Sequence, residues 1–213
     1  MYDIVLFDLD GTLTDPGEGI TNSVAYALNK FNIKVKDKTE LYNFIGPPLI
    51  DSFMKYYDMS YEDGLKAVDY YREYFGVTGI FENQVFDGIH ELLADIKKSG
   101  RTISLATSKP EVYAKRILEH FDLTQYFDFV GGATMDETRS KKVDVIAYTI
   151  KQLSVTDKSK VVMIGDRHHD IEGANQNGID SIGVLFGYGD REELETAGAT
   201  YIAETVNDIL KLI

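Results

Sequence analysis

The sequence predicts an α/β fold, in which a Rossmann-like parallel sheet is covered by helices and an all-helical domain is inserted after the first strand. Residues 4–7, 102–107 and 161–164 are short apolar runs that end at polar residues, a pattern typical of buried strands. From residue 87 onward, helical and strand patterns alternate, which favours parallel strands with helices on both faces. Residues 15–86 show helical spacing and no convincing strand.

The predicted core comprises residues 1–14 and 87–213, and the predicted helical insertion comprises residues 15–86. The insertion begins with apolar residues at helical spacing after Glu18, and two more helical patterns follow Pro48 and Tyr61. After the insertion, the core is expected to contain a helix capped by Asp87, strand 102–107, a helix after Pro110, strand 127–130, helix 143–153, strand 161–164, helix 170–177, strand 181–185 and helix 206–212.

Composition narrows the classes of protein to which the chain can belong. The 213 residues are 44% hydrophobic, which is enough for a sizeable core. Lys and Arg number 22 against 35 Asp and Glu, and the net charge of −13 disfavours sequence-independent binding to nucleic acid or to an anionic membrane. Cysteine is absent, which excludes disulfides and thiolate chemistry. No apolar run approaches the roughly 18 residues of a membrane helix, and we expect a cytoplasmic protein.

Three predicted strands are followed by polar residues that can take part in chemistry. Asp8, Thr107 and Asp166 each come directly after an apolar run. Because the carboxyl ends of parallel strands meet at one edge of a sheet, we expect these side chains to converge on one crevice. Asp10 and Asp170 lie close by in sequence and bring the number of carboxylates to four.

Such a cluster requires positive charge, because each pair of carboxylates 4–5 Å apart costs roughly 3–4 kcal/mol at an effective dielectric constant of 20. Oxygen ligands of this kind suit Mg²⁺. Lysines can supply further compensation, and the nearest in sequence are Lys109, Lys141 and Lys142.

Two further features, the adjacent histidines His168 and His169 and the glycine-containing segment 187–189, give weaker indications of function. His168 and His169 are expected to point in different directions on a helix, which favours solvent exposure or local hydrogen bonds over metal binding. The segment Gly187-Tyr188-Gly189 lacks the spacing of a dinucleotide-binding loop and is expected to frame the crevice.

These motifs together resemble the haloacid dehalogenase superfamily of phosphohydrolases, and within it the phosphoglycolate-phosphatase-like branch that carries a helical cap. The first motif is Asp8-Leu9-Asp10-Gly11-Thr12, and the second is Thr107-Ser108-Lys109. The third is a lysine, either Lys142 or Lys141, because the Lys-Pro pair of many relatives is missing. The fourth is Gly165-Asp166-x-x-x-Asp170. The resemblance covers nearly the whole chain and implies the fold of that superfamily.

The resemblance also implies a role for each motif residue. Asp8 would attack phosphorus, Asp10 would protonate the leaving alcohol and then activate water, and Thr107 would hold phosphoryl oxygens. Lys142, favoured over Lys141, would neutralise charge. The Mg²⁺ ligands would be Asp8, Asp166 and the backbone carbonyl of Asp10, while Asp170 would orient a metal-bound water or the lysine. The residues expected to contact substrate are Gly11, Thr12, Ser108 and Lys109 in the core and Gly46 and Arg72 in the cap.

The resulting functional prediction is a Mg²⁺-dependent phosphatase. Its partner would be a small phosphorylated metabolite, such as phosphoglycolate, a nucleotide or a sugar phosphate, and it would act as a monomer or homodimer without nucleic acid or membrane. A phosphomutase of the same superfamily is the first alternative. A phosphoaspartyl receiver is less favoured, because a long-lived phosphoryl switch gains nothing from the second acid at Asp10 or from a lid.

Overall fold

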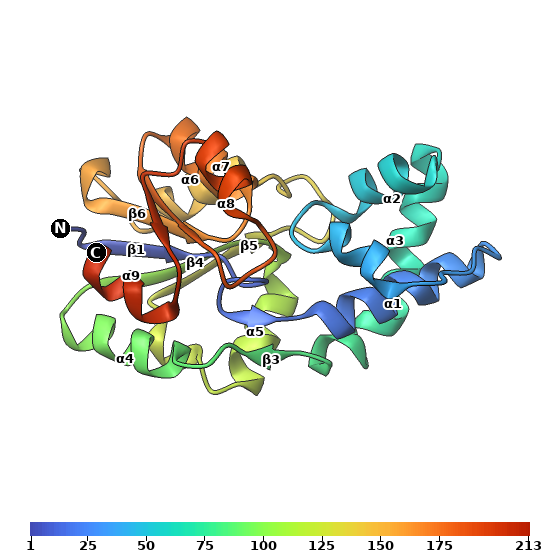
Figure 1. The fold of residues 1–213 in the computed structure, drawn as a ribbon, viewed down its shortest axis with the longest axis horizontal. Coiled ribbons are helices and arrows are strands. Elements are labelled where there is room, and N and C mark those ends of the chain that lie inside the picture. The colour runs from blue at the N-terminus through green and yellow to red at the C-terminus, as the bar shows by residue number, and fades with distance from the viewer. The chain divides into compact units, whose positions relative to one another are not determined.

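The chain folds into two compact units in a computed structural model that describes residues 1–213 (Figure 1). The core unit consists of Met1–Asp15 and Val85–Ile213, and the cap unit consists of Pro16–Gln84. The chain therefore passes between the units one residue after the expected first boundary and two residues before the expected second one. None of the helices has both the length and the apolar character needed to cross a membrane.

The core unit contains a six-stranded sheet in which every recorded strand pair is parallel, which confirms the predicted α/β fold. The strand order is β5-β4-β1-β6-β7-β8. The strands are β1 (Ile4–Phe7), β4 (Thr102–Pro110), β5 (Phe129–Ala133), β6 (Val161–Gly165), β7 (Asp180–Val184) and β8 (Tyr201–Ala203). Because β4 and β6 flank β1 on opposite sides, the chain reverses its direction of winding at β1, where ligands collect in open sheets of this kind.

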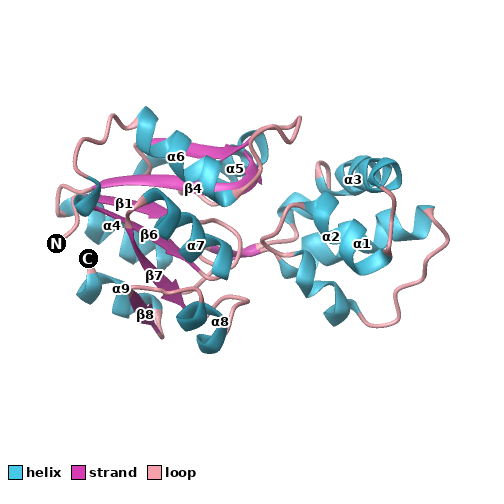
Figure 2. Cartoon of the chain, turned by 90° about the horizontal axis from the view of Figure 1, so that it is seen from above, coloured by secondary structure: helices cyan, strands magenta, loops and turns pink.

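Helices cover both faces of this sheet (Figures 1 and 2). Helices α6 (Lys142–Gln152) and α7 (His168–Asn177) lie against one face. The opposite face carries α4 (Ile89–Lys98), α5 (Glu111–His120) and α9 (Val206–Leu212), and α8 (Arg191–Thr196) lies beside α7. Short 3-10 turns, η3 (Thr124–Tyr126) and η4 (Lys158–Lys160), precede β5 and β6.

The register of the central strands places their polar ends side by side. Phe7 is the last residue of β1, and its partners are Leu105 in β4 and Ile164 in β6. All three side chains are fully buried, so the hydrophobic core holds the strands in this register. Consequently Asp8, Thr107 and Asp166, each one or two positions further along, emerge at the same edge of the sheet.

The cap unit is helical and has its own apolar core. It contains α1 (Gly17–Lys30), η1 (Lys38–Phe44), α2 (Leu49–Tyr57), α3 (Tyr61–Phe75) and η2 (Gly79–Phe81). The Ser60 side chain caps α3 by accepting a hydrogen bond from the backbone N–H of Asp63 at 3.1 Å. Phe44 and Phe53 are buried with ring centroids 5.0 Å apart, which ties α2 to η1.

Several elements differ from the sequence-based expectation. The residue that caps α4 is Gly88, at a φ of 87°, so the prediction that Asp87 caps this helix is wrong. Helix α8 and strand β8 were not predicted, because each is too short to show a period. The two-residue strands β2 (Thr14–Asp15) and β3 (Gln84–Val85) were also missed, and they pair where the chain passes between the units.

Candidate active site

Three buried carboxylates meet at the carboxyl edge of the sheet. Asp8 follows β1, Asp166 follows β6, and Asp170 lies in the first turn of α7. One carboxylate oxygen from each lies within 4.8 Å of the other two, and their exposed fractions are 4%, 0% and 1%. The expected convergence of Asp8 and Asp166 is therefore present in the structure.

Lys142 is the cation that joins two of these acids. Its Nζ lies 2.6 Å from Oδ1 of Asp8 and 2.8 Å from Oδ1 of Asp170, and it donates to the carbonyl of Ala106 at 3.1 Å. Burial alone would lower the pKa of Lys142, but the two carboxylates outweigh burial and raise it above its ordinary value. Lys141, the alternative, is exposed at the N-cap of α6.

Asp10 has a separate cationic partner. Nζ of Lys109 lies 2.8 Å from Oδ2 of Asp10, and both side chains are buried. Oδ1 of Asp10 is buried and makes no hydrogen bond. Burial raises the pKa of the Asp10 carboxyl above its ordinary value, although the Lys109 ammonium opposes this shift. Thr107 is buried beside them, and its hydroxyl accepts a hydrogen bond from the backbone N–H of Lys109 at 3.2 Å.

Asp166 is held by hydrogen bonds from two loops. The Thr12 hydroxyl donates to Oδ1 at 3.2 Å, and the backbone N–H of Tyr188 donates to Oδ2 at 2.9 Å. Burial raises the pKa of Asp166 well above its ordinary value, and the charges of Asp170 and Asp8 add to the increase. A cation bound nearby would oppose this shift and stabilise the carboxylate form of Asp166.

Asp170 is fixed at the start of α7. Its Oδ2 accepts a hydrogen bond from the backbone N–H of Arg167 at 3.1 Å, and its Oδ1 faces Lys142. Burial raises the pKa of its carboxyl, while Lys142 opposes the shift. With both oxygens engaged by the chain, Asp170 is placed to orient Lys142.

Glycines allow the loops of the site to approach one another. Gly11 has a φ of +82°, and a Cβ built there would lie 2.2 Å from Oδ2 of Asp166. A Cβ on Gly187 would lie 2.3 Å from the carbonyl oxygen of Gly11, and one on Gly189 would lie 2.0 Å from that of Asp166. The segment 187–189 therefore packs directly against the first and fourth motifs, as its expected position at the crevice requires.

The remaining predicted residues are not all brought together. Ser108 is half-buried within β4, next to Thr107. Gly46 and Arg72 belong to the cap unit, and their contact with substrate stays a prediction. Sequence reasoning missed the Tyr188 amide and the Ala106 carbonyl as site groups, because backbone groups leave no signature in residue type. Only the glycines flanking Tyr188 pointed to that loop.

The charge balance of the site fits one divalent cation. With all four carboxyl groups ionised, Asp8, Asp10, Asp166 and Asp170 face two ammonium groups (Lys109 and Lys142), and the difference is two negative charges. All the side-chain donors are carboxylate oxygens, which favour a hard cation such as Mg²⁺ over softer metals. The unpaired buried oxygen of Asp10 and the raised pKa of Asp166 support the same conclusion.

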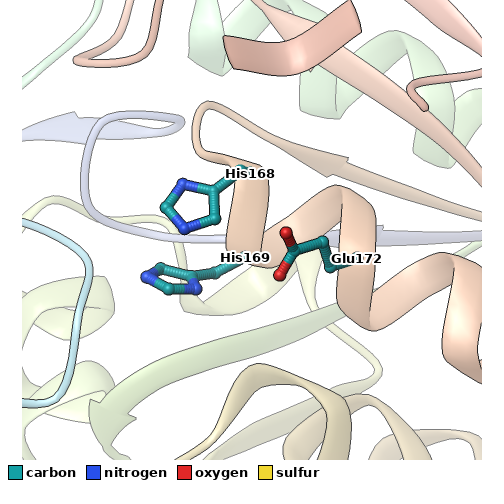
Figure 3. Close-up of side chains that lie close together, drawn as sticks. All are labelled: His168, His169 and Glu172. Carbon is teal, nitrogen blue, oxygen red and sulfur yellow. The ribbon is translucent and has the colours of Figure 1, made fainter. Parts of the chain in front are cut away.

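The two adjacent histidines lie close together, contrary to the sequence-based expectation that they diverge (Figure 3). The ring centroids of His168 and His169 are 3.8 Å apart. Both residues lie in the first turn of α7, and Nδ1 of His168 lies 2.8 Å from Oε1 of Glu193 on α8. Burial and nearby positive groups lower the pKa of His169 to about 4.

Comparisons with known proteins agree with this geometry. Residues 5–184 match the family model described as haloacid dehalogenase-like hydrolase. The chain is 44% identical over 200 residues to a 5′-nucleotidase from Pseudomonas aeruginosa, with 94% of this chain and 90% of that protein covered. It is 38% identical over 208 residues to the tyrosine-protein kinase PtkA of Mycobacterium tuberculosis, with coverages of 97% and 70%. A crystal structure of a predicted phosphatase from Clostridium acetobutylicum superimposes with a TM-score of 0.97 at 50% identity and covers 100% of this chain and 98% of that one.

Proposed function

Because the chain belongs to the haloacid dehalogenase-like hydrolase family, as its motifs indicated, we propose that this phosphatase hydrolyses small phosphomonoesters with Mg²⁺ and through an aspartyl phosphate on Asp8. The observation that carries the proposal is the position of Asp8. It lies at the end of the central strand, with Lys142 at 2.6 Å and the carboxylate of Asp166 within 4.8 Å. A carboxylate in such surroundings is oriented and partly neutralised for attack on an anionic phosphate.

In the first step, one carboxylate oxygen of Asp8 attacks phosphorus and the bond to the leaving alcohol breaks. Lys142 stays beside Asp8 and offsets the negative charge that gathers on the phosphoryl oxygens. The Thr107 hydroxyl, which is buried near the carboxyl end of the neighbouring strand β4, holds a phosphoryl oxygen in this proposal. The product of the step is an acyl phosphate on Asp8 and a free alcohol.

Asp10 handles the protons in both steps. Its raised pKa allows the carboxyl to hold a proton and deliver it to the leaving oxygen. The resulting carboxylate then takes a proton from the water that attacks the acyl phosphate, which releases inorganic phosphate and regenerates Asp8. Lys109 at 2.8 Å keeps the carboxyl in place between the steps.

Asp8, Asp166 and the backbone carbonyl of Asp10 would hold the Mg²⁺, and Asp170 would act through Lys142. When bound, the cation would neutralise the carboxylates and the phosphate so that the two anions can approach. Thr12 and Tyr188 fix Asp166 by hydrogen bonds, which keeps its oxygens in one orientation.

Among the possible substrates, we propose nucleoside 5′-monophosphates first, ahead of phosphoglycolate and sugar phosphates. The support is the 44% identity to a protein named 5′-nucleotidase over 90% of its length. The deciding experiment ranks kcat/KM for a panel of nucleoside 5′-monophosphates, 3′-monophosphates, phosphoglycolate, sugar phosphates and phosphotyrosine. If the 5′-monophosphates rank no higher than the 3′-isomers, the proposed substrate class is wrong.

The reaction itself is tested with p-nitrophenyl phosphate. Steady turnover that requires Mg²⁺ and stops in EDTA is expected, together with rapid-quench labelling of the protein that hydroxylamine removes, as it does from an acyl phosphate. A phosphomutase would instead return the phosphoryl group to a sugar phosphate and release little free phosphate. If a sugar phosphate supplied as substrate is converted to its isomer and no inorganic phosphate is released, the proposed hydrolysis is wrong.

A further inference from the structure

The N-terminal end of α7 gathers three side chains that the proposed phosphatase reaction does not use. They are His168, His169 and Glu172, and one ligand atom from each lies within 4.8 Å of the other two. In Figure 3 the two imidazole rings lie one over the other, and the carboxylate of Glu172 lies beside them. His168 and His169 are half-buried and Glu172 is exposed, so the group is open to solvent on one side.

Glu193 fixes the orientation of one of these rings. Its Oε1 lies 2.8 Å from Nδ1 of His168 and also accepts hydrogen bonds from the backbone N–H of His168 at 2.8 Å and from Nε of Arg167 at 2.9 Å. With Nδ1 bound to this carboxylate, Nε2 of His168 is the nitrogen left for another partner. Histidines that bind metals characteristically have their second ring nitrogen paired with a carboxylate in this way.

We propose that His168, His169 and Glu172 form a binding site for a transition metal ion of the zinc class, separate from the carboxylate site. Two imidazole nitrogens and one carboxylate oxygen are a ligand set suited to Zn²⁺ or Co²⁺ and poorly suited to Mg²⁺. Three protein ligands leave the fourth position of a tetrahedral ion open to water or to another ligand.

The side chains would have to rearrange to bind the ion. Ligand atoms around a tetrahedral Zn²⁺ lie about 3.4 Å apart, given bonds of roughly 2.1 Å. The three atoms now lie within 4.8 Å of one another, and the two rings lie one over the other with centroids 3.8 Å apart. Binding would therefore turn the imidazole rings apart and bring the exposed Glu172 side chain closer. The opposite side of the same turn carries Asp170, which faces Lys142. One helical turn would therefore serve two sites with different metal preferences.

Calorimetric titration with Zn²⁺ tests the proposal, using untagged full-length protein in saturating Mg²⁺. We expect one Zn²⁺ per chain and a loss of affinity of at least tenfold in both His168→Gln and Glu172→Gln. His120→Gln, on the exposed end of α5, is the matched control and should bind like the unchanged protein. Because His168→Gln also removes the contact with Glu193, Glu172→Gln keeps the test valid if the first variant folds poorly.

The readout is binding and does not depend on the proposed phosphatase activity. Titration with Co²⁺ should give the visible absorption of a four-coordinate ion with nitrogen ligands, and Glu172→Gln should weaken it. Equal Zn²⁺ affinity in all variants, or no binding at all, would overturn the proposal. So would loss of Zn²⁺ binding in Asp166→Asn alone, because the ion would then occupy the carboxylate site.

Discussion

Nζ of Lys142 lies 2.6 Å from Oδ1 of Asp8 and 2.8 Å from Oδ1 of Asp170, so one ammonium joins the end of the central strand to the first turn of α7. All three side chains are at least nine-tenths buried. In such surroundings the ions have lost most of their hydration, and each depends on its partners for compensation. Lys142 therefore stabilises the fold and also offsets the negative charge of Asp8, the proposed nucleophile.

Lys142→Met should remove this compensation and destabilise the protein. Breaking a buried ion pair by removing one partner costs roughly 3–5 kcal/mol, because the remaining charge stays buried and unpaired. Urea unfolding monitored by circular dichroism measures the change, and turnover of p-nitrophenyl phosphate should fall at the same time. Lys141→Met is the control, because Lys141 is exposed and is expected to leave both quantities nearly unchanged. A larger loss in Lys141→Met would mean that the third motif has the other register.

Asp8→Asn should abolish turnover while the fold stays intact. The amide has nearly the shape of the carboxylate but is a poor nucleophile, so the acyl phosphate cannot form. The substitution loses one ion pair with Lys142 and also relieves repulsion from Asp166 and Asp170. Turnover and far-ultraviolet circular dichroism measure the two effects separately. Near-normal turnover in this variant would show that Asp8 is not the nucleophile.

Asp10→Asn should slow the reaction by ~10²–10⁴-fold, the usual contribution of general acid and base catalysis. Single-turnover experiments that follow alcohol and phosphate separately should show phosphate released much more slowly than in the unchanged enzyme. An activated ester with a good leaving group needs less help from an acid and should be affected less in the first step. If both products appear at normal rates, Asp10 has no role in proton transfer.

The sequence allowed the sheet and the site to be predicted because both depend on local patterns. The strand at 161–164 is a continuous apolar run, and Asp166 follows it after the single residue Gly165. Parallel pairing then requires such strand ends to share an edge, so the meeting of Asp8 with Asp166 followed from topology alone.

Other features depend on contacts between distant residues and could not be predicted in this way. The partner of Asp10 is Lys109 rather than Lys142, and this choice depends on how β4 extends beyond Thr107. The Tyr188 amide reaches Asp166 because a loop 22 residues away returns to the site. His168 contacts Glu193, which lies on a helix that the sequence did not reveal.

His169 should give the protein a characteristic dependence of stability on pH. Its pKa is lowered to about 4 in the folded state, mainly by burial and then by His168, against about 6.5 when unfolded. Between these values the unfolded chain binds more protons, so the stability that the neutral ring contributes is complete above pH 6.5 and is lost as the pH falls towards 4. The free energy of unfolding, measured in EDTA at several pH values, should depend less on pH in His169→Asn, whereas His120→Asn should behave like the unchanged protein. Protonation of His169 near pH 6.5 in an NMR titration would contradict the expectation.

Gly11→Ala should damage the site more than its effect on the backbone explains. Both Gly11 and Gly100 have a φ of +82°, a conformation that costs a residue with a Cβ ~1–2 kcal/mol. At Gly100 nothing lies within 4 Å of the added carbon, whereas at Gly11 it would lie 2.2 Å from Oδ2 of Asp166. Gly100→Ala therefore measures the backbone cost alone, and any further loss of stability in Gly11→Ala comes from the displaced loop or carboxylate. A displacement of about 1 Å should lower turnover by roughly 10²-fold. Gly100→Ala should keep normal activity. Equal effects of the two substitutions, measured by urea unfolding and by Mg²⁺-dependent turnover, would show that the loop of Gly11 does not position Asp166.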